Sequence, residues 1–157
     1  MIPTTQTTFY SEEDKSRGNC LNAVLASLLH IPIEHIPEFP YDKTYVQVMN
    51  EWLKQFGLAF ILIGTFDEHC ESEHIEGCHH MLAGKTKRFR DISHGVVGID
   101  GHMVFDVHPS RDGLTEVTHA GVFISLEPWK TVATTQIGRK LQVINPNAKW
   151  GDSVFQS

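Results

Sequence analysis

Apolar residues between Cys20 and His30 recur at the spacing of an α-helix. They lie three or four positions apart and form one stripe able to pack on a core, made of Leu21, Val24, Leu25, Leu28 and Leu29. Asn19 precedes this stripe, and its side-chain oxygen is expected to cap the helix by accepting an amide hydrogen of the first turn. The helix is expected to end near Ile31, because the residue before Pro32 avoids helical geometry.

A second helical pattern covers residues 44 to 56. Its apolar side consists of Tyr45, Val48, Met49, Trp52 and Phe56. Gly57 is placed to end this helix in the left-handed conformation. The next six residues, Leu58 to Ile63, are almost wholly apolar, and the pattern predicts a short buried strand.

Strand patterns dominate the rest of the chain. Residues 93–99 and 103–107 flank the dipeptide Asp100-Gly101, which is a strong hairpin signal. Further strands are expected at residues 81–84, 121–126 and 140–144, and a polar surface loop at 64–80. With helices early and strands late, we predict one α+β domain over residues 1–157, in which helices pack on a largely antiparallel sheet.

The composition of the chain excludes several classes of protein. The chain has 157 residues, a formal net charge of −6 and 41% hydrophobic residues, so a folded domain is expected and broad binding to nucleic-acid phosphates is not. No apolar run approaches the roughly 18 residues of a membrane helix, and the N-terminus lacks a secretory pattern. Three cysteines cannot form a closed disulfide framework. We therefore expect a cytoplasmic protein, with no membrane partner.

Cys20 is the strongest candidate for chemistry. It lies at the start of the first predicted helix, where the positive end of the helix dipole stabilises a thiolate. A nucleophilic thiol also needs a base and a group that orients the base. The simpler interpretation is a packed cysteine, since free cysteine is among the most buried residue types.

His94 and Asp106 lie on the two arms of the predicted hairpin and form a candidate base and orienting carboxylate. A strict two-residue turn at Asp100-Gly101 would point them to opposite faces of the sheet, because side chains alternate along a strand. The pair therefore requires an odd loop, such as one that includes His102, or a bulge in one arm. We predict the odd register. An ordinary surface histidine and a turn-capping aspartate are the alternative.

Two segments resemble papain-like cysteine peptidases, most nearly small bacterial and phage relatives of the bacteriocin-leader (double-glycine) peptidases. Residues 18–29 (GNCLNAVLASLL) resemble their nucleophile helix, and residues 94–110 (HGVVGIDGHMVFDVHPS) resemble their His strand, turn and Asp strand, in the same order. Leu21 departs from the glycine or tryptophan that often follows the cysteine in that family.

The resemblance implies a papain-like fold and a Cys20–His94–Asp106 triad that hydrolyses peptide, isopeptide or other amide bonds through an acyl-thioester, with no cofactor. It also implies a glutamine upstream of the cysteine that helps stabilise the oxyanion, and Gln6 is the glutamine in that position. Gln6 precedes Cys20 by more residues than is usual, so residues 11–17 would have to loop out. The same triad also serves acyl transferases and deamidases, and a degenerate member of the fold would act as a cytoplasmic binding protein.

Two other clusters carry weaker hypotheses. Residues 69–80 contain two cysteines and four histidines, which are ligands that zinc favours, yet their spacing matches no zinc signature. A solvated loop, or a disulfide from this segment to Cys20, is the alternative to a zinc site. Residues 85–90 (KTKRFR) form the one basic cluster, for which we weigh an anionic substrate or partner site against a solvated turn.

Overall fold

The chain forms two helices and five strands in a computed structural model, which describes residues 1–13, 16–64, 77–89 and 92–127. The elements are α1 (Cys20–Leu29), a 3-10 turn η1 (Ile33–His35), α2 (Tyr45–Leu53), a 3-10 turn η2 (Lys54–Phe56), β1 (Leu58–Gly64), β2 (His79–Lys85), β3 (His94–Ile99), β4 (His102–Phe105) and β5 (Glu116–Ser125). The expected strand at 140–144 and most of the expected loop at 64–80 lie outside the described residues.

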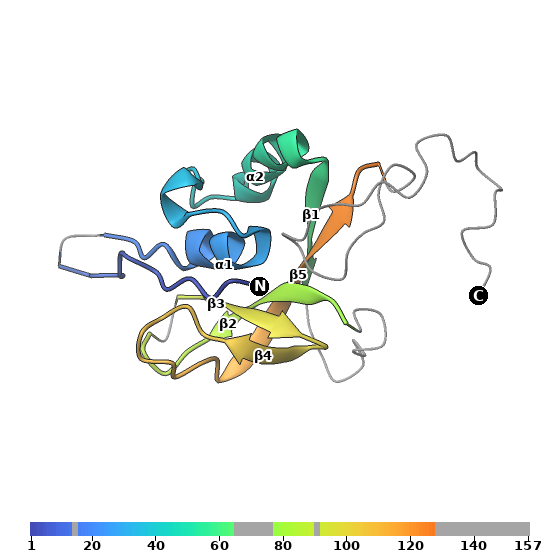
Figure 1. Cartoon of the computed structure of the whole chain (residues 1–157). Coiled ribbons are helices and arrows are strands. Elements are labelled where there is room, and N and C mark those ends of the chain that lie inside the picture. Colours follow the sequence, from blue (N-terminus) through green and yellow to red (C-terminus); the bar gives the residue numbers. More distant parts are fainter. Residues whose placement is uncertain (14–15, 65–76, 90–91, 128–157) are drawn as a thin grey trace.

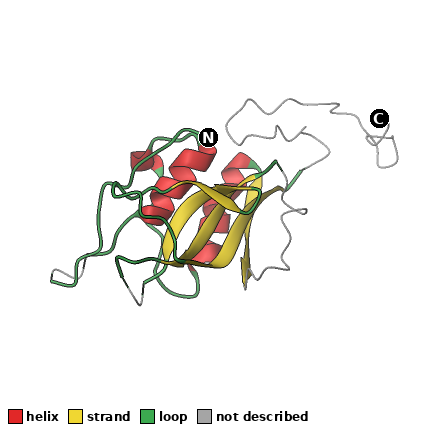
Figure 2. Ribbon diagram, turned by 90° about the horizontal axis from the view of Figure 1, so that it is seen from below, coloured by secondary structure: helices red, strands yellow, loops and turns green. Residues whose placement is uncertain are grey.

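The five strands form one antiparallel sheet in the order β1-β5-β2-β3-β4. Both helices cover the same face of this sheet, α1 over β3 and β2 and α2 over β1 (Figures 1 and 2). The predicted α+β class, with helices packed on an antiparallel sheet, is therefore confirmed. Among the described residues, neither helix has the length and apolarity needed to cross a membrane.

α1 is the central element of the core. Every residue from Ala23 to Leu29 is buried, because the apolar stripe faces the sheet and the opposite side of the helix is also covered. The helix ends at Leu29, and its C-cap residue His30 adopts the left-handed conformation with φ of 58°. This is two residues before the end expected near Ile31.

The predicted cap at the start of α1 is wrong in its detail. Asn19 is the N-cap residue, but its side chain makes no hydrogen bond to the first turn. Its Oδ1 instead accepts the backbone N–H groups of Thr7 and Thr8, each at 3.0 Å. The Asn19 side chain therefore bonds to residues distant in the sequence instead of to its own helix, and it joins the N-terminal segment to the start of α1.

The second helical region is confirmed as α2 followed by η2, and Gly57 ends it with a φ of 68°. The next strand is less buried than predicted. β1 is an edge strand covered by α2 on one face only, so Phe60 is buried while Ile61 on the other face is 45% exposed. β5 begins five residues earlier than expected, because its first half is polar and has no apolar run.

The two glycines at strand ends near β5 give a matched test of the packing. A Cβ added to Gly84 would lie 1.8 Å from the backbone oxygen of Glu116, next to a bulge in the β2–β5 ladder. We expect Gly84→Ala to lower the free energy of unfolding by roughly 1–3 kcal/mol, because backbone cannot move aside without breaking the ladder. Chemical denaturation measures the change.

Gly64→Ala is the control for this prediction. A Cβ there would meet nothing closer than His119 at 3.7 Å, which is ordinary contact. We expect this variant to be neutral or slightly stabilised, since alanine loses less backbone entropy on folding than glycine. Equal destabilisation by the two variants would contradict the close approach at Gly84.

Candidate functional site

Cys20 is the first residue of α1 and lies half-buried on the wall of a cavity of about 450 Å³. Its sulfur interacts with the His94 side chain and with the backbone N–H groups of Leu21 and Gly95. Burial by itself raises the pKa of the Cys20 thiol. The hydrogen bond and positive charge of His94, together with the two amides, outweigh burial and hold the pKa below its ordinary value.

A two-residue turn joins β3 to β4. Asp100 and Gly101 have φ angles of 51° and 76°, and Ile99 pairs with His102 across them. Positive φ at both central residues is the requirement of a type I′ hairpin turn. Taken alone, this turn sets the even register, which places the two candidate catalytic side chains on opposite faces.

A bulge restores the odd register within β4. Val97 pairs with Phe105 rather than with Val104, which is the extra residue. One extra residue moves the side-chain alternation by one position, so Asp106 shares a face with His94. The predicted register is therefore confirmed through a bulge and not through a longer loop.

His94 and Asp106 form a short, buried pair. The His94 Nε2 atom donates to Asp106 Oδ1 at 2.6 Å, and both side chains are less than a tenth exposed. Because Nε2 is engaged, Nδ1 is the ring nitrogen left for the Cys20 sulfur. Burial lowers the pKa of His94, but its hydrogen bonds to Asp106 and Cys20 and their negative charges raise it above the ordinary value.

The Asp106 carboxylate is fixed on both oxygens. Oδ1 also accepts the backbone N–H of His108 at 2.9 Å, and Oδ2 accepts the Gly113 N–H at 2.8 Å and Arg88 Nη1 at 3.3 Å. Burial raises the pKa of Asp106, but these donors and His94 hold it well below its usual range. An ionised carboxylate held in this way keeps the His94 proton on Nε2 and supports an imidazolium.

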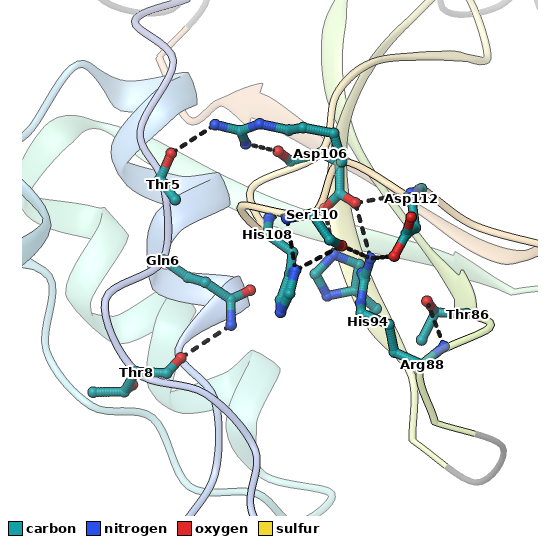
Figure 3. Close-up of polar contacts among 12 residues, drawn as sticks. Thr5, Gln6, Thr8, Thr86, Arg88, His94, Asp106, His108, Ser110 and Asp112 are labelled. Atoms are coloured by element: carbon teal, nitrogen blue, oxygen red, sulfur yellow. Dashed lines mark hydrogen bonds and ion pairs between the residues drawn. The ribbon is translucent and has the colours of Figure 1, made fainter.

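Two neighbours of the triad were missed from the sequence. Arg88, in the basic cluster at 85–90, forms ion pairs with Asp106 and with Asp112, at 3.3 and 3.5 Å. The basic cluster was the one signal that could have found it. His108 lines the cavity with its ring centroid 6.2 Å from that of His94 (Figure 3), and nothing in the sequence distinguished it from the other histidines.

Gln6 reaches the same cavity from the N-terminal segment and extends towards His108 and His94 (Figure 3). Its backbone N–H donates to the Val107 oxygen at 2.9 Å, and its side chain is buried. The side-chain Nε2 donates to the Thr8 oxygen at 3.0 Å, which leaves a second amide hydrogen on that nitrogen.

The long separation between Gln6 and Cys20 is absorbed as expected. The backbone N–H of Asn19 donates to the Thr8 oxygen at 3.2 Å, so the chain returns to its starting point before α1 begins. Ser11 donates to Ser16 within this excursion. Arg111 donates to the Asp106 carbonyl oxygen and to Thr5 Oγ1, which ties the segment carrying Gln6 to the residues that follow β4.

The structure describes only residues 77–80 of the histidine- and cysteine-rich segment. Cys78 is a free, exposed thiol, whereas His80 is fully buried, with Nδ1 bonded to the Cys78 oxygen at 2.8 Å and Nε2 packed near Gly98. Within the described ranges, no three groups lie together as a metal site. The zinc hypothesis for the remainder of the segment stays untested.

The Cys20–His94 contact predicts an unusually reactive thiol. We expect iodoacetamide to alkylate Cys20 faster than Cys78 at neutral and mildly acidic pH, because the lowered pKa of Cys20 raises the fraction present as thiolate. In His94→Ala, we expect the pKa of Cys20 to rise, so that its alkylation rate increases only at higher pH. Each pKa unit of increase slows alkylation near pH 6 by about tenfold. Mass mapping of the two sites measures both rates, and an inert Cys20 in folded protein would rule out the site.

Removing the bulge residue tests what brings the pair together. Deletion of Val104, which is 47% exposed, is expected to restore the even register and carry Asp106 away from His94. The pKa of His94, followed by NMR of the imidazole, then falls, and Cys20 alkylation near pH 6 slows by about tenfold or more. Val104→Ala keeps the register and the reactivity. A deletion variant with an unchanged His94 titration would exclude the bulge as the positioning device.

Comparisons with known proteins add no relative to this picture. A scan against protein-family models, a search of curated proteins and a search of solved structures each found no match. The resemblance to papain-like peptidases therefore stays a prediction. Cys20 and His94 line one cavity, and the buried Asp106 carboxylate is hydrogen-bonded to His94.

Proposed function

We propose that the protein is a thiol hydrolase that cleaves a peptide, isopeptide or other amide bond. The observation that carries the proposal is the position of the His94 imidazole, bonded to the Asp106 carboxylate on one side and to the Cys20 sulfur on the other. This arrangement supports the proposal because thiol catalysis requires a nucleophile, a base and a group that orients the base. The adjoining cavity provides space for a substrate.

In the first half of the proposed reaction, the Cys20 thiolate attacks the carbonyl carbon of the amide. The protonated His94 gives its Nδ1 proton to the departing nitrogen, the C–N bond breaks, and an acyl-thioester forms on Cys20. Asp106 remains ionised and stabilises the imidazolium throughout. In the second half, His94 removes a proton from water, which attacks the thioester and releases the acid and the Cys20 thiolate.

The oxyanion of each tetrahedral intermediate requires hydrogen-bond donors. The backbone N–H of Cys20 is one candidate, because amides in the first turn of a helix have no intrahelical acceptor. The second hydrogen of Gln6 Nε2 is the other, and Gln6 lines the same cavity as Cys20. The buried position of Gln6 and its backbone bond to Val107 support this role.

An activated ester tests the acyl chemistry without knowledge of the natural substrate. We expect p-nitrophenyl acetate to release a burst of nitrophenol, and intact and peptide mass analysis to place the acetyl group on Cys20. Cys20→Ala removes the burst, and Gln6→Ala slows acylation by roughly 10²-fold if its amide stabilises the oxyanion. Gln47→Ala, which changes an exposed glutamine on α2, is the matched control.

The outcomes also separate the alternative activities. Turnover in water alone supports a hydrolase, whereas an acetyl-enzyme that turns over only after an amine is added indicates an acyl transferase. Absence of both a burst and steady Cys20-dependent release of nitrophenol in folded wild-type protein would overturn the proposal and favour a degenerate, binding-only member of the fold. The cytoplasmic location stays a prediction.

A further inference from the structure

Three aromatic side chains line the cavity, Tyr10, Tyr41 and Phe89, and we call them the aromatic wall. The Tyr10 and Phe89 rings meet edge to face with centroids 5.1 Å apart, and the Tyr41 hydroxyl donates to the Gly18 oxygen at 3.3 Å. These contacts join distant parts of the chain and hold the three rings beside the cavity. Burial raises the pKa of Tyr41, and Tyr41 lies close enough to Cys20 for the Cys20 charge to raise that pKa further.

A guanidinium lies on this wall. The Arg17 side chain lines the cavity, with its guanidinium carbon 4.6 Å from the centroid of the Tyr41 ring. Stacking on an aromatic face limits the orientations of the guanidinium while leaving its edge of N–H donors open. Among the described residues, no carboxylate forms an ion pair with Arg17.

The charged side chains that line the cavity include two guanidiniums, those of Arg17 and Arg88, and no carboxylate. The Cys20 thiolate and the protonated His94 compensate each other, and the lowered pKa of His108 favours its neutral form. The nearby acids are already engaged, because Asp106 holds His94 and Asp112 pairs with Arg88. Glu38, which acts electrostatically on Tyr41, is exposed and does not line the cavity. Arg17 is thus the cation in this cavity that lacks a described counter-charge, in a protein whose net charge is −6.

We infer that the substrate of the proposed hydrolase carries a carboxylate close to the bond that is cleaved, and that Arg17 binds it. The inference rests on the proposed function and names its substrate class: an amide whose acyl or amine part bears the acid, with its apolar portion against the aromatic wall. The planar fork of a guanidinium matches the two oxygens of a carboxylate. A guanidinium without a counter-charge also attracts ligands of the opposite sign.

Two alkylating agents of nearly the same shape provide the test. Iodoacetate carries a carboxylate and iodoacetamide a neutral amide, and in both the Cys20 sulfur displaces iodide to form a C–S bond. The measured quantity is the ratio of their rate constants at Cys20, so that any general change in the thiol cancels. We expect Arg17→Gln to lower this ratio about threefold to fivefold, the effect of one partly exposed ion pair. Added salt lowers the wild-type ratio further than that of the variant.

Two further variants control for the change in net charge and for a folding defect. Lys87→Gln removes the same charge from an exposed residue outside the cavity and is expected to leave the ratio at its wild-type value. Arg17→Lys, which retains the charge without the fork, is expected to give an intermediate ratio and guards against a folding defect in Arg17→Gln. Arg88 is unsuitable for the test because it holds Asp106.

The possible failures are distinguishable. An Arg17→Gln ratio equal to that of wild type, with rapid iodoacetamide alkylation of Cys20, overturns the carboxylate site and leaves the proposed hydrolase intact. A fall in the ratio of equal size in Lys87→Gln also overturns it, because net charge and not the site would then account for the effect. Slow alkylation of Cys20 by both reagents, relative to Cys78, contradicts the proposed function itself.

Discussion

The 2.6 Å hydrogen bond between His94 and Asp106 is the interaction on which the rest of the site depends, and it exists because β4 contains one extra residue. The turn at Asp100-Gly101 has the geometry that its sequence favours, and that geometry alone would place the two side chains on opposite faces. The bulge at Val104 corrects the register. A backbone irregularity on an edge strand is therefore part of the site rather than a defect of the sheet.

Asp106 also organises the chain around the cavity. Its side chain gathers donors from β3, from the residues after β2 and from the loop that leads to β5, while its backbone oxygen accepts from Arg111. Arg111 and the bond from Gln6 to Val107 fasten the N-terminal segment beside α1. The candidate oxyanion donor and the candidate base thus share one framework, so that a change in the register of β4 would disturb both.

Much of the site could be predicted from the sequence. Helical periodicity predicts that Cys20 lies at a helix start. Because side chains alternate between the two faces along each strand, the sequence also predicts that His94 and Asp106 can meet only if the hairpin contains one extra residue. Arg88 and His108 could not be assigned, because their significance lies in what they contact across the sheet. The same reason explains the error at Asn19, whose side chain is capable of local capping but binds Thr7 and Thr8 instead.

The sequence by itself determined the elements whose causes are local: α1 and α2 from apolar periodicity, the stop at Gly57, the turn at Asp100-Gly101, and hence the α+β class. Only the tertiary structure decided the order of the strands and the exposure of β1 at the edge of the sheet. It also decided the bulge that brings Asp106 to the same face as His94, and the stacking of Arg17 on Tyr41. Propensity and periodicity act over a few residues, whereas pairing register and charge environment depend on segments that meet only when the chain has folded.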